Sequence, residues 1–163
     1  MDVKGKVVVV TGGAYGIGQG LCRRFVREGA KKVIIADVNE AGAKSVADEI
    51  KGTAVTCDVR KEEDIIHMVR FTEEKFGLID LFCSNAGIIV LGGVEADNED
   101  WKRIWEINVL AHVYAARAVL PGMINRGGGA FMVTASAAGL LSQIGSLPYS
   151  VTKHAAVGFA ENI

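Results

Sequence analysis

The sequence predicts an α/β protein built on a doubly wound parallel sheet, and three observations carry this prediction. Short apolar segments alternate with helix-length amphipathic segments along the whole chain. A run of four valines leads directly into a glycine-rich turn, and the turn leads into a helical pattern. Uniformly apolar strands are typical of a parallel sheet covered by helices on both faces. Because the crossovers of such sheets are right-handed, few arrangements other than a doubly wound one remain.

Composition predicts one domain, over residues 1–163. Half of the residues are hydrophobic, 23% are charged and the net charge is −1, so the chain can bury a large core. This balance gives no electrostatic case for nucleic acid or an anionic membrane. The three cysteines, Cys22, Cys57 and Cys83, lie far apart in apolar segments, which indicates buried thiols in a reducing compartment. With no N-terminal run long enough to span a bilayer, we expect a cytoplasmic protein.

The segment Lys6–Gly18, KVVVVTGGAYGIG, combines a β-branched strand with a turn containing Gly12, Gly13, Gly16 and Gly18. A helical pattern begins at Ile17 and stops at Gly29. The beginning of a helix presents unpaired N–H groups and the positive end of its dipole, and glycines let a phosphate approach the backbone. The segment therefore predicts a phosphate-binding turn, although some glycine-rich matches are only tight turns.

A second strand, Val33–Ala36, ends at Asp37, nineteen residues after Gly18. Dinucleotide-binding folds place an acid there for the hydroxyl groups of the adenosine ribose. The alternative is that Asp37 is only a solvated residue at a strand end. No Lys-Ser or Lys-Thr follows the glycines, so the turn does not match a nucleoside-triphosphate loop. The combination favours a dinucleotide site.

The rest of the chain continues the alternation of helices and strands. The pattern predicts, in order, a helix over Glu40–Ile50, a strand over Ala54–Val59, a helix over Glu62–Phe76, a strand over Leu81–Ser84, a long helix over Asp100–Leu120 ending at Pro121, a turn at Gly127–Gly129, a strand over Ala130–Ser136 and a last helix beginning near Tyr149. Ligands bind at the carboxyl ends of the strands in such folds. Asp58, Asn85 and Ser136 fall there, together with Gly12 and Asp37.

The sharpest chemical signal is Tyr149-Ser-Val-Thr-Lys153, with Ser136 thirteen residues upstream. Residues four apart share one face of a helix, so the Lys153 ammonium can lie close to the Tyr149 ring. A fixed cation near a phenol favours its ionised form, and such a phenol can exchange a proton with a substrate oxygen. Ser136 can donate a hydrogen bond to the same oxygen. Taken alone, the Tyr–Lys spacing could also be a chance pair on an exposed helix face.

Together these motifs resemble the short-chain dehydrogenase/reductase family, whose fold is of the Rossmann type. The resemblance runs from residue 6 to the end of the chain and is carried by Thr11-Gly12, Gly16-Ile17-Gly18, Asp58, Asn85-Ala86-Gly87, Asn108, Ser136 and Tyr149-xxx-Lys153. It implies that Tyr149 is the general acid/base and that Ser136 orients the substrate carbonyl. It also implies that Lys153 holds the nicotinamide ribose, and that Asn108 holds a water in a proton relay.

The resemblance further implies a cofactor site formed by Gly12, Tyr15, Gly16, Ile17, Gly18, Asp37, Asp58, Val59, Asn85, Ala86, Gly87, Tyr149 and Lys153. Asp37 would bind both ribose hydroxyls and repel a 2′-phosphate. Relatives that select the phosphate carry a basic residue near these positions, whereas Tyr15, Val38 and Asn39 supply no cation here. We therefore expect NAD(H) rather than NADP(H), and no metal.

The expected reaction is hydride transfer between NAD(H) and a secondary alcohol or ketone. Ile88–Leu91 and Gly139–Leu147 would line the pocket mouth, and they are mostly apolar with Gln143 as a polar exception, which indicates a hydrophobic small molecule. The histidines lie on helical segments, where surface or packing roles are expected. By resemblance the protein would be a homo-oligomer, a dimer or tetramer.

Members of the family are usually longer, and the sequence ends at Ile163 within the catalytic helix. We expect the C-terminal third of the family fold to be missing from it, which would leave Ala130–Ser136 as an open sheet edge and Ala155, Ala156 and Phe159 exposed. The alternative function is a truncated nucleotide-binding module without turnover, which acts as a scaffold or regulator.

Overall fold

The computed structural model describes residues 2–163 and contains a five-stranded parallel sheet in the order β3-β2-β1-β4-β5. The strands are β1 (Val7–Thr11), β2 (Lys32–Asp37), β3 (Thr53–Thr56), β4 (Leu81–Ser84) and β5 (Ala130–Val133). Along the chain, β2 and β3 are added on one side of β1, and β4 and β5 are then added on the other side of β1. This reversal confirms the doubly wound, Rossmann-type fold and opens a crevice between the carboxyl ends of β1 and β4.

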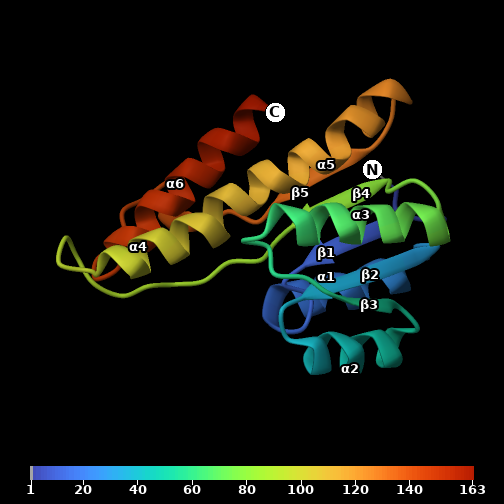
Figure 1. The fold of residues 1–163 in the computed structure, drawn as a ribbon, viewed down its shortest axis with the longest axis horizontal. Helices are drawn as coiled ribbons and strands as arrows, with labels where there is room; N and C mark the ends of the chain where they lie inside the picture. Colours follow the sequence, from blue (N-terminus) through green and yellow to red (C-terminus); the bar gives the residue numbers. More distant parts are fainter. Residues whose placement is uncertain (1) are drawn as a thin grey trace.

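Helices cover both faces of the sheet (Figure 1). They are α1 (Gly16–Arg27), α2 (Glu40–Ile50), α3 (Glu62–Phe76), α4 (Asn98–Trp105), α5 (Ala111–Asn125) and α6 (Leu147–Asn162). A π-helical turn, η1 (Glu106–Leu110), joins α4 to α5 without a break, and a short 3₁₀ turn, η2 (Ala137–Gly139), follows β5. In Figure 1, α6 runs alongside this continuous long helix.

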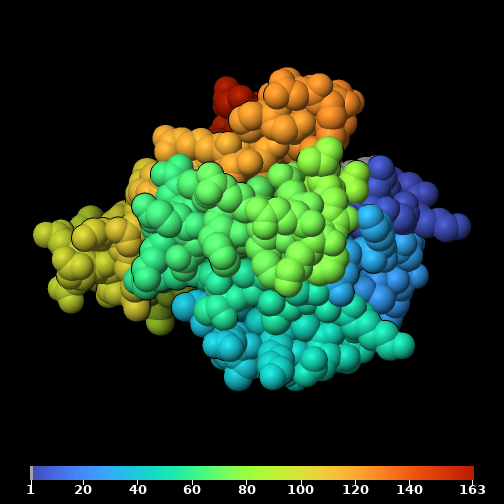
Figure 2. Space-filling model, turned by 45° about the vertical axis from the view of Figure 1, so that its right-hand side comes forward, coloured from blue at the N-terminus to red at the C-terminus, as the bar shows by residue number. Residues whose placement is uncertain are grey.

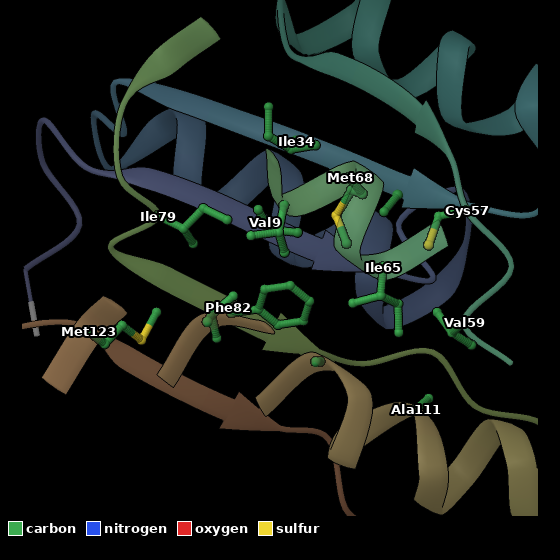
Figure 3. Close-up of a cluster of buried hydrophobic side chains, with 14 residues drawn as sticks. Val9, Ile34, Cys57, Val59, Ile65, Met68, Ile79, Phe82, Ala111 and Met123 are labelled. Carbon is green, nitrogen blue, oxygen red and sulfur yellow. The ribbon is translucent and has the colours of Figure 1, made fainter. Parts of the chain in front are cut away.

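Two apolar cores lie on opposite faces of the sheet because successive strand residues point in opposite directions. Val8 and Val10 of β1 pack with residues of α1 and α2, including Cys22 and Val46. Val9 lies in the other core with Phe82 of β4, beside α3 and α5. Figure 3 shows this second core, where Ile65 and Met68 of α3 approach the strands. The three cysteines are buried free thiols, as predicted.

The ends of two strands differ from the prediction. The strand expected over Ala54–Val59 ends at Thr56, because the chain turns at Asp58, whose N–H donates to Asp64 in α3 (3.0 Å). The strand expected over Ala130–Ser136 ends at Val133. The neighbouring strand β4 ends at Ser84. The carbonyl of Ser84 accepts the N–H of Thr134 (3.1 Å), and this is the last hydrogen bond between β4 and the chain that continues from β5.

The long helix is also longer than predicted, since Pro121 lies inside it and the helix continues to Asn125. A proline removes the backbone bond to the residue four positions earlier. Both Pro121 and that residue, Arg117, are exposed, so the freed carbonyl can be solvated. The last helix begins at Leu147, close to the predicted start near Tyr149, with Pro148 in its first turn, where proline is tolerated.

The expectation that α6 would expose Ala155, Ala156 and Phe159 is wrong, and Ala155 is partly buried. Ala156 is completely buried. The ring of Phe159 is partly buried, stacks on His112 of α5 (6.1 Å between centroids) and meets Phe131 of β5 edge-on (6.5 Å). Thus α6 packs against η2, η1, α4 and β5, and Phe159 reaches His112 of α5. The strand β5 lies at the edge of the sheet, as predicted.

The continuous helix Asn98–Asn125 is the one helix of the described residues that is long and apolar enough to cross a membrane, with a mean hydropathy of 1.3. By itself this is weak evidence, because core helices of soluble proteins have the same character. Here the helix packs against α3 and α6.

The segment between β4 and this helix projects from the molecule at the left of Figure 2.

Candidate active site

A cavity of about 820 Å³ opens at the carboxyl edge of the sheet. Every predicted cofactor-binding residue lines it, as does Ser136. One space therefore joins the glycine turn and Asp37 at one end to Tyr149 and Lys153 at the other. Of the predicted site residues, only Asn108 is absent from its walls. Sequence reasoning missed Cys57, Arg60, Ile107, Thr134 and Ala135, which also line the cavity.

The glycine turn leaves the N-terminus of α1 open. Tyr15 is the residue before the first helical turn, its side chain caps no N–H group, and the first turn contains no acidic residue. Gly16 has a φ of +55°, and a Cβ built there would meet nothing within 4 Å. A Cβ on Gly18 would instead lie 2.0 Å from the carbonyl oxygen of Gly12. The turn thus requires glycine for packing at one position and exposes backbone to the cavity at another.

Asp37 is held at the end of β2 by two backbone N–H groups. Its Oδ2 accepts from Ala14 (3.0 Å) and its Oδ1 from Asn39 (2.9 Å). Each carboxylate oxygen can accept a further hydrogen bond. The side chain is therefore a fixed acceptor on the cavity wall beside the glycine turn.

Asp58 lies in the turn between β3 and α3, where Arg60 binds it. The Arg60 guanidinium donates to both carboxylate oxygens, with the shortest contact at 2.6 Å. These hydrogen bonds hold the pKa of Asp58 below its ordinary value. Val59 is buried beside it. Arg60 could have been suspected from the sequence, because it follows two residues already assigned to a carboxyl edge.

Asn85 ties three strand ends together below the cavity. Its Nδ2 donates to the carbonyl of Thr11 at the end of β1 (2.9 Å), and its Oδ1 accepts from Thr134 Oγ1 after β5 (2.9 Å). Thr11 Oγ1 accepts the backbone N–H groups of Asn85 (3.0 Å) and Ala86 (3.2 Å). The segment Asn85–Gly87 is thus a rigid floor between the glycine turn and the α6 end of the cavity.

Lys153 is a buried cation at the α6 end of the cavity, only 4% exposed. Its Nζ donates to the carbonyl of Thr134 (2.9 Å) and lies 5.7 Å from the centroid of the Tyr149 ring. Burial lowers the pKa of Lys153 below its ordinary value. Thr134 is the one hydrogen-bond partner found for it among residues 2–163, and an ammonium has three donors. The remaining donors are available to a ligand in the cavity.

Ser136 begins η2 next to this end of the cavity. Its Oγ accepts the N–H of Ala138 (3.1 Å), so its own hydroxyl hydrogen stays available for donation. The hydroxyl is oriented by a backbone contact and can donate a hydrogen bond to an oxygen atom in the cavity. Tyr149 and Gln143 line the same region.

Asn108 lies behind the cavity, fully buried in the π-helical turn. Its Oδ1 accepts the N–H of Ile88 (2.8 Å), and its Nδ2 donates to the carbonyl of Ile88 (2.9 Å) and to Thr152 Oγ1 (3.2 Å). The amide is therefore engaged with protein groups rather than presented to the cavity. Because Thr152 lies between Tyr149 and Lys153 on α6, Asn108 connects the loop after β4 to the helix that carries both.

A doubly wound sheet with an open glycine turn and a cavity at its carboxyl edge defines the class of Rossmann-type α/β proteins. Within this class, the family model described as short chain dehydrogenase matches residues 6–163, and the chain belongs to this family. The recognition made from the motifs is confirmed.

Similar proteins and solved structures support the same family assignment. The chain is 36% identical to zerumbone synthase of Zingiber zerumbet, covering 100% of this chain and 63% of the relative. It is 36% identical to a mitochondrial borneol dehydrogenase of Lavandula x intermedia (98% and 62%), and 34% identical to 3beta-hydroxysteroid dehydrogenase 2 of Eggerthella lenta (98% and 64%). The chain thus spans about six-tenths of the length of these relatives.

Among solved structures, a short chain dehydrogenase/reductase from Burkholderia phymatum in complex with NAD superposes with a TM-score of 0.95 at 28% identity. It covers 99% of this chain and 59% of that one. LigO of Sphingobium sp. strain SYK-6, in its apo form, gives a TM-score of 0.92 at 29% identity (99% and 62%). The observed arrangement of strands and helices is therefore that of the family.

Proposed function

We propose that this chain carries the cofactor site and the catalytic residues of an oxidoreductase that transfers a hydride between NAD(H) and a hydrophobic secondary alcohol or ketone. The observation that carries the proposal is the single cavity that holds Asp37 and the glycine turn at one end and Ser136, Tyr149 and Lys153 at the other. Membership of the family and the NAD complex of the Burkholderia phymatum relative support it.

The residues present fit a dinucleotide. The open N-terminus of α1 offers N–H groups and a positive dipole end for the pyrophosphate. Asp37 would accept hydrogen bonds from the adenosine ribose, and Asp58 and Val59 would hold the adenine. Lys153 would donate to the second ribose through the N–H groups that do not bind Thr134. When bound, the nicotinamide supplies the hydride acceptor or donor of the reaction.

The chain's own residues handle the proton and the substrate oxygen. In the oxidation direction the Tyr149 oxygen takes the hydroxyl proton of the alcohol, and in reduction it returns a proton to the carbonyl oxygen. The buried Lys153 ammonium lies 5.7 Å from the centroid of this ring. Ser136 donates a hydrogen bond to the substrate oxygen and stabilises the negative charge that develops on it. Asn108 acts as a positioning residue for the loop and helix that hold these groups.

The substrate class rests on the apolar walls near Tyr149. Ile88 and Ile89 line the cavity there, and Leu140, Leu141 and Ile144, which flank the cavity residue Gln143 in the sequence, are exposed. Among residues 2–163, Lys153 is the one lysine or arginine that lines that end. Relatives named for borneol and a 3β-hydroxysteroid agree with an apolar alcohol. A cytoplasmic location and a homo-oligomeric state stay predictions from the sequence.

A screen of the complete protein tests the proposal. Secondary alcohols of increasing apolar size are incubated with NAD, and the near-ultraviolet absorbance of reduced nicotinamide is followed. Turnover of apolar alcohols, faster than that of carboxylated ones, is expected. Binding of NADH without turnover of any alcohol or ketone would instead favour the alternative, a nucleotide-binding module that acts as a scaffold or regulator.

A further inference from the structure

His112 of α5 and Ser84 at the end of β4 form a buried polar pair that takes no part in the proposed reaction. The imidazole Nδ1 lies 2.6 Å from the Ser84 hydroxyl oxygen, and the two residues are 1% and 3% exposed. The other ring nitrogen, Nε2, is buried without a hydrogen-bond partner among residues 2–163. An unpaired buried nitrogen costs free energy, and a phenyl ring would fill a similar space without it. Stability alone therefore does not explain the imidazole, whereas its contact with Ser84 does.

Ser84 is linked to the Lys153 ammonium through one residue, Thr134. The Ser84 carbonyl accepts the N–H of Thr134 (3.1 Å). The Thr134 carbonyl in turn accepts a hydrogen bond from Lys153 Nζ (2.9 Å). The direction in which the ammonium points therefore depends on how the Thr134 backbone is oriented, and this orientation depends on Ser84.

The end of β4 is held from two directions. From the neighbouring strand β1, Thr11 Oγ1 donates to the carbonyl of Cys83 (3.4 Å) and accepts the N–H of Asn85 (3.0 Å), so the residues on either side of Ser84 are fixed. From the helix layer, His112 binds the Ser84 hydroxyl. Without the imidazole, this strand end would be held by β1 and β5 but not by the helix that covers it.

His112 also contacts the helix that carries Lys153. Its ring stacks on Phe159 of α6, with 6.1 Å between centroids, and Phe159 follows Lys153 by six positions on this helix. The charge of Lys153 is one of the two causes that lower the pKa of His112, so the imidazole lies within the field of the ammonium. One side chain thus contacts both the strand end and the helix between which Lys153 is placed.

In the proposed function, Lys153 donates to the nicotinamide ribose through the N–H groups that do not bind Thr134. Their directions follow from the bond to Thr134, because the three donors of an ammonium have fixed angles to one another. We propose that His112 and Ser84 are positioning residues that hold the Thr134 carbonyl, and through it the Lys153 ammonium, in the orientation that hydride transfer requires. The inference deepens the proposed function and rests on it.

Kinetics of the complete protein, with an alcohol found by the screen, test this pair above pH 6.5, the ordinary pKa of histidine. Ser84→Ala removes the hydroxyl, and His112→Phe removes both ring nitrogens but keeps a ring against Phe159. Each variant should lower kcat by about tenfold or more and weaken NADH binding, because a misplacement of about 1 Å can cost about a hundredfold in rate. His112→Phe should do so without a matching loss of unfolding free energy, since it also removes the unpaired nitrogen.

Two further variants separate positioning from stability. Ser84→Thr keeps the hydroxyl but adds a methyl group to a packed core, so it should lower the unfolding free energy and still retain most of kcat. Thr72→Val is the matched control, because it removes another fully buried hydroxyl, which bonds the Met68 carbonyl within α3. It should lower the unfolding free energy and leave kcat and NADH binding unchanged.

The outcomes distinguish the positioning pair from the proposed function. If Ser84→Ala and His112→Phe turn over at the wild-type rate, the pair is overturned, while turnover by the wild type leaves the proposed function standing. A loss of kcat in Ser84→Thr or in Thr72→Val as large as that in Ser84→Ala would show that the rate follows stability, and it would also overturn the pair. If the wild type turns over no alcohol or ketone, the proposed function fails and the pair fails with it.

Discussion

Mild acid should destabilise this protein through one buried histidine. His112 lies on α5 with 1% of its surface exposed, and its Nδ1 is 2.6 Å from Oγ of Ser84 at the end of β4. Phe159 stacks on its ring. Burial, and after it the charge of Lys153, lower the pKa of His112 from 6.5 to about 4. The folded protein therefore keeps this imidazole neutral at pH values where the unfolded chain protonates it.

The magnitude follows from this difference in pKa. Between pH 6.5 and about 4 the unfolded state binds more protons than the folded state, so the free energy of unfolding decreases as the pH falls. The stabilisation is fully present above pH 6.5 and is lost progressively towards pH 4. At about 1.4 kcal/mol per pKa unit, the total loss is about 3 kcal/mol, a large share of the stability of a typical domain.

Urea unfolding followed by circular dichroism, at a series of pH values from above 6.5 down to about 4, measures this effect. The comparison is with His112→Gln, which has no titrating group at this position. Other acids and bases are common to both proteins, so they cancel in the difference. The difference in unfolding free energy should change by about 3 kcal/mol over the interval. A difference independent of pH would refute the reasoning.

Two further predictions concern the glycine turn and the buried amide. Gly18→Ala should disrupt the turn and abolish NADH binding, because the added Cβ would lie 2.0 Å from the carbonyl oxygen of Gly12. The control variant is Gly20→Ala, whose added Cβ would meet no atom within 4 Å. It should leave NADH binding intact and stabilise α1 by up to about 1 kcal/mol. Fluorescence titration and thermal unfolding check both, and equal effects of the two variants would contradict this account. Asn108→Ala should lower the unfolding free energy by about 2 kcal/mol, because it removes the side-chain partner of the partly buried N–H and carbonyl of Ile88 and of the buried Thr152 hydroxyl. A loss below about 1 kcal/mol in denaturant titration would show that these bonds contribute little.

The parts of the fold that the sequence could predict are those fixed by local pattern and by chain topology. The valine strand, the glycine turn and the helix that follows it are one continuous pattern. Because all strands are parallel, Asp37, Asn85 and Ser136 necessarily meet at one edge of the sheet. The Tyr149–Lys153 spacing needs only a helix. Each of these predictions depends on neighbouring residues or on a general rule of the fold.

Features that depend on tertiary contacts could not be predicted in this way. Pro121 is compatible with its helix only because the freed carbonyl lies on an exposed side. The π-helical turn at Glu106–Leu110 turns Asn108 towards Ile88 and Thr152, and nothing in the local pattern of apolar residues indicates it. The bond between Tyr15 and Asn39 spans 24 positions in the sequence, so it is visible only once β2 and α2 are placed.

The most direct test of the central claim is the kinetics of Tyr149→Phe in the complete protein, with an alcohol found by the screen. Phenylalanine keeps the ring against Lys153 but removes the oxygen that exchanges the proton. We expect kcat to fall by at least about a hundredfold, the usual contribution of a general acid or base, while the dissociation constant for NADH stays nearly unchanged. A variant that turns over at a rate comparable to the wild type would contradict the assignment of Tyr149, and with it the mechanism proposed for this site.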